Sequence, residues 1–212
     1  MTDWRVRQGT ERFIEWACVR RSLDGDAPCG DIGFVRAAAE HAVIVAIDGL
    51  GHGAAAAKVA AAACRALDEH ACECDDPSEL VVRCHRALSR SRGVVMSLAV
   101  FRADDDTMAW LGVGNVRGRF LRGSADRVPT ESLLLRGGVV GYELPPLRVS
   151  TVPVRSGDCV VFATDGIRGS APFAGVPQAH SLERAARELL DAQSSGSDDA
   201  LILVARYLGG ER

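Results

Sequence analysis

The stretch that decides the fold reads DIGFVRA at residues 31–37 and HAVIVAIDGLGHG at residues 41–53. Two strand-like segments flank a small-residue turn near residues 39 and 40, and this pattern predicts a β-hairpin. In an antiparallel hairpin the first residue of one strand faces the last residue of the other, so Asp31 should lie opposite Asp48. The chain topology alone therefore brings two carboxylates together at one end of the hairpin.

Three helices are predicted from capping signals and apolar periodicity. Residues 54–70 are rich in alanine, and their charges fall in one narrow stripe at helical spacing, which indicates a helix buried over most of its circumference. Asp76 followed by Pro77 is typical of a helix start, and the apolar residues up to Leu88 form one face. Ser181 caps a third helix, whose apolar residues recur at helical spacing.

The remaining segments have strand character or punctuation typical of loops. We expect strands at residues 94–102, 107–113 and 117–121, which form an antiparallel meander within residues 93–122. A long loop with one short strand is expected at 131–146, and a central strand at the apolar run 200–205. Strands are also predicted at residues 13–20, 147–154 and 158–164. Strands thus bracket helices at both ends of the chain, which favours an α+β protein with two stacked antiparallel sheets and helices outside.

Composition limits the class of protein. With 212 residues, of which 47% are hydrophobic, we expect a single domain over residues 1–212. The net charge of -3 provides no broad basic field, which argues against nucleic-acid and membrane-surface binding. No segment is typical of a membrane span or a signal peptide, so we expect a cytoplasmic protein whose seven cysteines are reduced thiols.

Four aspartates, Asp31, Asp48, Asp165 and Asp198, stand at the ends of predicted strands. If the strand before Asp165 lies antiparallel to the strand after Asp198, a second pair forms beside the first. Two carboxylates about 4 Å apart repel by roughly 4 kcal/mol, so such a cluster must protonate, separate or bind cations. Oxygen-only ligands suit magnesium or manganese, and the carbonyl of Gly49 is a further candidate ligand.

Two interpretations of these aspartates stay open at this point. Aspartate followed by glycine at a strand end is also ordinary turn chemistry, with no metal involved. The alternative is a pair of hard cations that ionise a bridging water for in-line attack on a phosphorus atom.

Six short segments occur in an order that is informative when they are taken together. They are Gly30-Asp31, Asp48-Gly49-Leu50-Gly51-His52-Gly53, Gly112-Val113-Gly114-Asn115-Val116, residues 138–145, Ala163-Thr164-Asp165-Gly166-Ile167 and Asp198-Asp199-Ala200. Together they resemble the motifs of the SpoIIE-type branch of the metal-dependent type 2C protein phosphatases, and within it the RsbX-type stress-response phosphatases. The resemblance covers roughly residues 20–207. It implies a four-layer α/β/β/α sandwich with a site for two manganese or magnesium ions.

The resemblance also implies roles for individual residues. Asp48 would bridge both metals, the Gly49 carbonyl would bind one of them, and Asp165 and Asp198 would bind the other. Asp31 would bind directly or through water. The implied activity is dephosphorylation of a phosphoserine or phosphothreonine regulatory protein of the stressosome scaffold type, by attack of a metal-bridging water on phosphorus.

Other assignments stay open in the sequence. Family members often grip the phosphate with an N-terminal arginine, for which Arg20 and Arg21 are possible counterparts. His52 follows the glycine turn at a helix start and could donate a proton to the leaving alkoxide, or only pack there. The alternatives to a protein phosphatase are a catalytically silent partner-binding module with the same fold and a phosphoester hydrolase acting on a small molecule.

Overall fold

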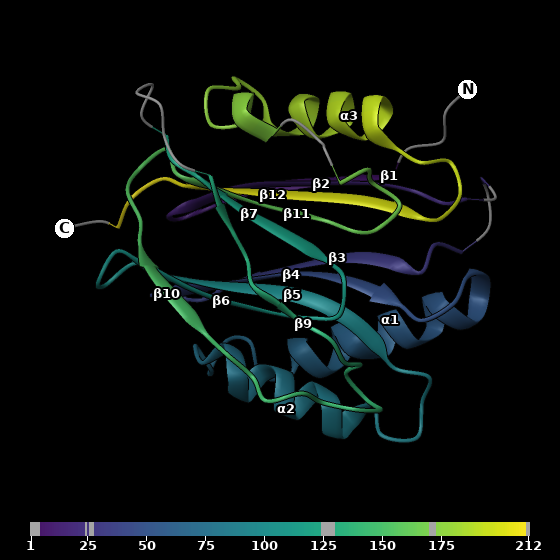
Figure 1. Cartoon of the computed structure of the whole chain (residues 1–212). Helices are drawn as coiled ribbons and strands as arrows, with labels where there is room; N and C mark the ends of the chain where they lie inside the picture. The colour runs from purple at the N-terminus through teal and green to yellow at the C-terminus, as the bar shows by residue number, and fades with distance from the viewer. Residues whose placement is uncertain (1–4, 24, 26–27, 124–129, 170–172, 211–212) are drawn as a thin grey trace.

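The computed structural model describes residues 5–23, 25, 28–123, 130–169 and 173–210, and it has four layers (Figure 1). Two sheets are stacked face to face, and helices cover the outer face of each sheet. The predicted α/β/β/α sandwich of α+β class is therefore confirmed.

The first sheet contains six strands, in the order β1 (Arg5–Glu11), β2 (Ile14–Arg21), β12 (Ala200–Tyr207), β11 (Cys159–Ala163), β7 (Arg117–Leu121) and β8 (Glu131–Ser132). The main path of the second sheet runs β10 (Ser150–Pro153), β6 (Thr107–Val113), β5 (Val94–Arg102), β4 (His41–Gly49) and β3 (Asp31–Ala37), and β9 (Leu135–Arg136) pairs with β6. All these pairings are antiparallel except β6 with β9.

The helices begin and end close to the predicted positions. The α-helices are α1 (Gly53–Asp68), α2 (Pro77–Ala87) and α3 (Leu182–Gln193), and a 3-10 helix spans Phe173–Gly175. Asp76 and Ser181 are N-cap residues, and each side-chain oxygen accepts a hydrogen bond from a backbone N–H in the first turn of its helix. These local bonds explain why the starts of α2 and α3 were predictable.

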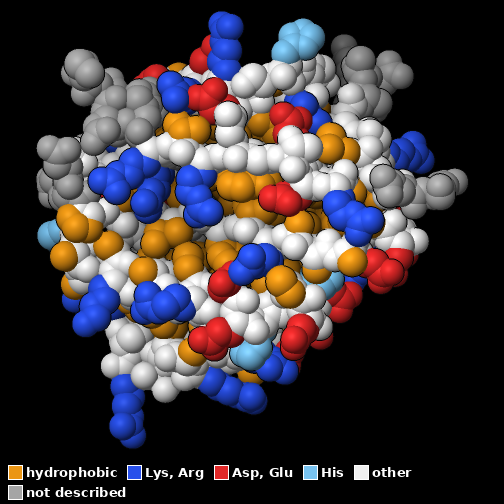
Figure 2. Space-filling model, turned by 180° about the vertical axis from the view of Figure 1, so that it is seen from behind, with side chains coloured by type: hydrophobic (Ala, Val, Ile, Leu, Met, Phe, Trp, Pro, Cys, Tyr) orange, Lys and Arg blue, Asp and Glu red, His pale blue; other side chains and the backbone are white. Residues whose placement is uncertain are grey.

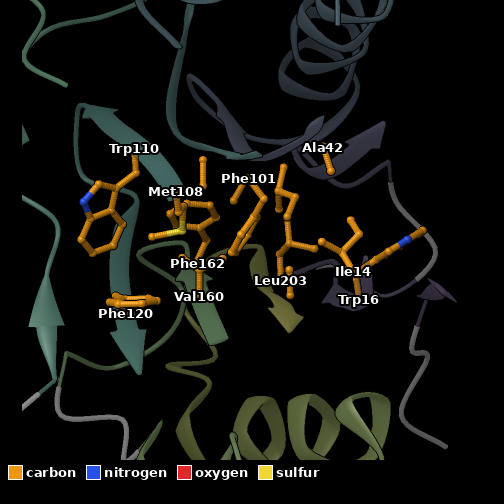
Figure 3. Close-up of a cluster of buried hydrophobic side chains, with 14 of the residues drawn as sticks. Ile14, Trp16, Ala42, Phe101, Met108, Trp110, Phe120, Val160, Phe162 and Leu203 are labelled. Carbon is orange, nitrogen blue, oxygen red and sulfur yellow. The ribbon is translucent and has the colours of Figure 1, made fainter. Parts of the chain in front are cut away.

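The main core lies between the two sheets, where large side chains from both inner faces interlock (Figure 3). Strand β5 is buried on both faces: Phe101 points into the inter-sheet core, while Leu98 and Val100 pack with α1 and α2. This double burial explains the continuous apolar character of β5, since neither face meets water. A third cluster packs α3 against the outer face of the first sheet.

Two expectations about the strands were wrong. Strand β7 was expected to continue the meander from β5 and β6, but it crosses to the first sheet and pairs with β11. The turn that redirects the chain contains Gly114 at φ +93°, a backbone conformation that favours glycine. The edge strand β1 was not predicted, because its polar residues lack the apolar alternation of a half-buried strand.

Residues 131–146 were expected to contain one short strand, and they contain two, β8 and β9, one in each sheet. The expectation of one domain over residues 1–212 stays a prediction. Of the helices in the described ranges, none has the length and apolarity needed to cross a membrane.

Candidate metal centre

Two antiparallel strand pairs bring the four predicted aspartates to the same end of the sandwich. Asp31 and Asp48 are direct partners in the register of β3 and β4, as predicted. Strand β11 pairs with β12 so that Ala163 faces Ile202, which places the residues after β11 beside the residues before β12. Asp165 and Asp198 therefore belong to one sheet end, and Asp31 and Asp48 belong to the end of the facing sheet.

Asp31 is the deepest of these carboxyl groups, with 2% of the residue exposed. Its Oδ2 accepts a hydrogen bond of 2.7 Å from the hydroxyl of Thr164, which in turn accepts one of 2.8 Å from the backbone N–H of Leu201. Burial raises the pKa of Asp31 well above its ordinary value, and the nearby charge of Asp48 raises it further. The Thr164 hydrogen bond acts in the opposite direction.

Asp48 has a carboxyl group without a counter-charge among the described residues. Burial raises its pKa to about 7, and the negative charges of Asp165 and Asp198 act in the same direction. Within the described part of the chain, the Asp48 carboxylate accepts no hydrogen bond and has no arginine or lysine within 4 Å. A partly buried carboxylate with carboxylate neighbours and no counter-charge is suited to binding a cation.

Asp165 is oriented by a residue from another strand end. The side-chain amide of Asn115, in the turn after β6, donates a hydrogen bond of 2.9 Å to Asp165 Oδ2. The next residue, Gly166, lies against the backbone before β12: a Cβ there would come within 2.0 Å of the Asp199 carbonyl oxygen. Glycine is therefore required at this position so that the two segments can approach.

The adjacent residues Asp198 and Asp199 have different surroundings. Asp199 is 5% exposed, and its two carboxylate oxygens accept hydrogen bonds from the backbone N–H groups of Leu23 and Gly30, at 2.8 and 2.6 Å. Asp199 therefore holds the segment that leads into β3. Asp198 lines the open pocket described below, and its Oδ1 accepts only a local hydrogen bond from the N–H of Asp199.

Gly49 is buried where β4 meets the first turn of α1. A Cβ at this position would lie 2.3 Å from the carbonyl oxygen of Ala56, so only glycine allows the helix to pack this closely. Its own carbonyl oxygen lies near Gly30, at the start of β3 and beside Asp31. A Cβ built on Gly30 would lie 3.5 Å from the Gly49 carbonyl oxygen and 3.4 Å from Asp199 Oδ2, so this carbonyl lies on the Asp199 side of the site.

A pocket of about 360 Å³ opens over this sheet end. Its lining includes Asp48, Asp165, Asp198 and Asn115, the exposed imidazole of His52 at the N-cap of α1, and the apolar side chains of Leu23, Leu50, Val95 and Val139. Of the described residues that line it, none is an arginine or a lysine. The pocket thus combines an anionic floor with a partly apolar rim.

The donor set fits hard divalent cations, because it consists of carboxylates and a backbone carbonyl. In the described ranges, however, no group of three or more His, Cys, Asp or Glu side chains is arranged to hold a metal ion as it stands. The neighbouring carboxylates lie close enough to raise the pKa of Asp31 and Asp48, but their oxygens do not converge on one point. Binding a cation would therefore require small side-chain adjustments.

Comparison with known proteins agrees with this fold. A family model described as stage II sporulation protein E (SpoIIE) matches residues 38–208. The chain belongs to the SpoIIE family. A comparison with curated protein sequences gave no match.

Solved structures place this SpoIIE-family chain among the PP2C phosphatase folds. A chain from work on the bacterial stressosome as a modular system adapted to control secondary messenger signalling is 25% identical, with a TM-score of 0.82, and the match covers 91% of this chain and 99% of that chain. RsbX in complex with magnesium is 21% identical, with a TM-score of 0.83 and coverage of 96% and 100%. The PP2C domain of SpoIIE from Bacillus subtilis is 18% identical, with a TM-score of 0.73 and coverage of 100% and 66%.

The two arginines considered for phosphate binding in this SpoIIE-family protein have different surroundings. Arg21 forms an ion pair of 2.6 Å with Asp191 on α3, on the outer side of the first sheet. The guanidinium of Arg20 points between the sheets and donates a hydrogen bond of 2.7 Å to the backbone carbonyl of Asp31. Of the pair, Arg20 is the residue next to the carboxylate group.

Three residues that support the site, namely Thr164, Asn115 and Asp199, received no role from the sequence. Each belongs to a quoted motif, and that membership was the available signal. Their partners Asp31, Asp165 and Gly30 are distant in sequence, at separations of 133, 50 and 169 residues. Only the folded chain shows these contacts.

Proposed function

We propose that this SpoIIE-family chain is a metal-dependent phosphatase that hydrolyses phosphoserine or phosphothreonine on a regulatory protein. The observation that carries the proposal is the uncompensated Asp48 carboxylate, which lies with other carboxylates at the floor of an open pocket. A site built to bind an anion directly would not place only negative side chains there. Divalent cations would reverse the local charge and make the pocket attractive to a phosphate group.

The residues of this chain would divide the binding of two manganese or magnesium ions between the two sheet ends. Asp48 would contact both ions, with the Gly49 carbonyl on one side and Asp165 and Asp198 on the other. Asp31 would contribute from below, directly or through water. Ions held in this way lower the pKa of water and offset the charge of phosphoryl oxygens.

Supporting residues keep this set of ligands in place. Thr164 orients Asp31, Asn115 orients Asp165, and the hydrogen bonds of Asp199 fix the entry to β3. Because Asp199 uses both oxygens for backbone N–H groups, Asp198 is left to face the pocket. Outer partners of this kind typically change metal affinity or activity by about 10–100-fold when they are removed.

His52 is placed to act at the opening of the pocket. It is exposed, lines the pocket and makes no side-chain capping bond with α1, so its imidazole is available to a bound substrate. We propose that it donates a proton to the departing serine or threonine oxygen. A histidine that only packs would leave the pH profile of turnover unchanged when replaced by glutamine.

The proposed substrate is a phosphorylated regulator of the stressosome scaffold type. The support is the 25% identity and full-length similarity to a chain studied with the bacterial stressosome, together with the fold shared with RsbX. The open rim of the pocket, with Leu23 and Val139 on it, suits a phosphorylated side chain presented by a protein surface. The cytoplasmic location expected from the sequence stays a prediction.

The test measures hydrolysis of a chromogenic aryl phosphate and of a phosphoserine peptide with manganese, with magnesium and with EDTA. We expect metal-dependent turnover that Asp48→Asn and Asp165→Asn both abolish. The matched control is Asp104→Asn, which makes the same change in the exposed turn between β5 and β6. Folded, metal-loaded protein without turnover on either substrate would contradict the proposal and favour a catalytically silent binding module.

A further inference from the structure

A group of arginines lies at one edge of the sandwich, apart from the acidic pocket. We call it the basic edge and define it as Arg5 and Arg7 of β1, Arg20 of β2 and Arg65 of α1. In the strand register Arg5 faces Arg20 and Arg7 faces Cys18, so these side chains project from one face of the first sheet. Cys18 packs against Gly33 of β3, which shows that this face looks toward the second sheet.

The second sheet does not cover this part of the first sheet. Its outermost strand, β3, packs against β2 and β12, so β1 lies beyond it. Cys64 on α1 lies within the electrostatic reach of arginines from three elements, β1, β2 and α1. Burial raises its pKa to about 11, while the charges of Arg7, Arg20 and Arg65 all act to lower it.

In the part of the chain that the structure describes, these guanidinium groups form no ion pair with a carboxylate. Among the described residues, no carboxylate oxygen lies within 4 Å of Arg7, Arg20 or Arg65, although elsewhere Arg36 pairs with Asp68 and Arg102 pairs with Asp75. Arg7 lies over the ring of Trp16, with 5.9 Å from its Cζ to the centroid. Arg20 donates to a backbone carbonyl. At least three of the four positive charges, those of Arg7, Arg20 and Arg65, therefore lack an ion-pair partner among the described residues, in a chain of net charge -3.

Figure 2 shows the molecule from the side opposite to that of Figure 1. Lys and Arg side chains gather on the left part of that face, beside a strip of hydrophobic side chains. Arg5, Arg7 and Arg65 are exposed, and Arg20 is half-buried. A set of charges spread over two strands and a helix suits an extended anionic surface better than one small anion.

We propose that the basic edge docks an acidic segment of the phosphoprotein on which the neighbouring pocket acts. This inference rests on the proposed function. Arg20 connects the basic edge with the carboxylate group, because its guanidinium donates a hydrogen bond to the backbone carbonyl of Asp31. A protein partner is favoured over nucleic acid, because the rest of the surface carries a net negative charge that a long polyanion would also meet.

The basic edge also lies largely outside the part of the chain that defines the family. Arg5, Arg7 and Arg20 precede residues 38–208, which match the SpoIIE family model. The edge is therefore a candidate for selecting the partner of this chain, whereas the pocket serves the chemistry. Docking of this kind changes KM for the matching substrate and leaves kcat unchanged.

The experiment uses two phosphoserine peptides that differ only in a flanking tract, glutamate in one and glutamine in the other. Arg7→Ala/Arg65→Ala is compared with Arg86→Ala/Arg148→Ala, which removes the same charge from exposed positions elsewhere. At low salt we expect KM for the glutamate peptide to rise about fivefold to tenfold in the first variant only. The glutamine peptide and aryl phosphate should be unaffected.

A binding measurement keeps this inference separate from the proposed activity. The fluorescence anisotropy of a labelled, unphosphorylated glutamate peptide reports docking even if the protein has no turnover. Arg7→Lys/Arg65→Lys should restore most of the binding, which excludes a folding defect as the cause of the loss. Equal loss in both alanine variants, or tighter binding of an RNA oligonucleotide than of the glutamate peptide, would overturn the proposal.

Discussion

Replacing Asp48 by asparagine should stabilise the metal-free protein. The raised pKa of Asp48 means that the folded state disfavours its charged form, through burial and through the charges of Asp165 and Asp198. A pKa of about 7 against an ordinary value of 3.8 corresponds to about 4 kcal/mol at full ionisation. Because the carboxylate is partly exposed and water screens it, we expect about half of this, about 2 kcal/mol.

The effect has a defined dependence on pH. Between the unfolded pKa near 3.8 and the folded pKa near 7, the folded state binds more protons than the unfolded state, so the wild-type free energy of unfolding falls as pH rises. Asparagine does not titrate, so the advantage of the variant grows through this window. It is absent below pH 3.8, where both states of the wild type are protonated, and it is complete above pH 7.

Thermal unfolding followed by circular dichroism in EDTA measures this difference at pH 5 and pH 8. For a chain of this size we expect Asp48→Asn to unfold about 4–8 °C above the wild type at pH 8, and by a smaller margin at pH 5. Asp104→Asn should match the wild type at both values. Manganese should then reverse the order, because the wild type gains more binding energy. An asparagine variant no more stable than the wild type at pH 8 in EDTA would refute the argument that these carboxylates repel.

Three further substitutions test single contacts of the site. Thr164→Val should lower the free energy of unfolding by about 1–3 kcal/mol in urea titrations, since it leaves the buried Leu201 N–H without its acceptor; an unchanged midpoint would contradict this role. Asn115→Ala should weaken manganese binding by about tenfold in calorimetric titration, and unchanged affinity would mean that Asn115 does not orient Asp165. Gly49→Ala should destabilise the protein by about 3 kcal/mol in the same urea assay, because the added Cβ would collide with the Ala56 carbonyl. The control Gly137→Ala should be tolerated, because its Cβ would point into open space. Equal stability of the two variants would argue against the close approach of α1.

Much of the fold could be predicted from the sequence because its signals are local. Strands β5, β6 and β7 were predicted with the ends they have, and the caps of α2 and α3 are formed by the residues expected. The β3–β4 hairpin has a short turn, so its register follows from counting residues, and it places Asp31 beside Asp48. The antiparallel pairing of β11 and β12 was a conditional inference that the structure bears out.

Other features were decided only by the tertiary structure, because they depend on contacts between residues far apart in the chain. Local periodicity indicates that β7 is a strand, but it cannot say which sheet the strand joins. Two adjacent aspartates, Asp198 and Asp199, are equivalent as sequence, and only their folded surroundings make one face the pocket and the other hold backbone N–H groups. The basic edge likewise exists only because β1, β2 and α1 meet there. The sequence by itself thus determined the elements and the aspartates at their ends, while packing over long separations decided what surrounds each charge.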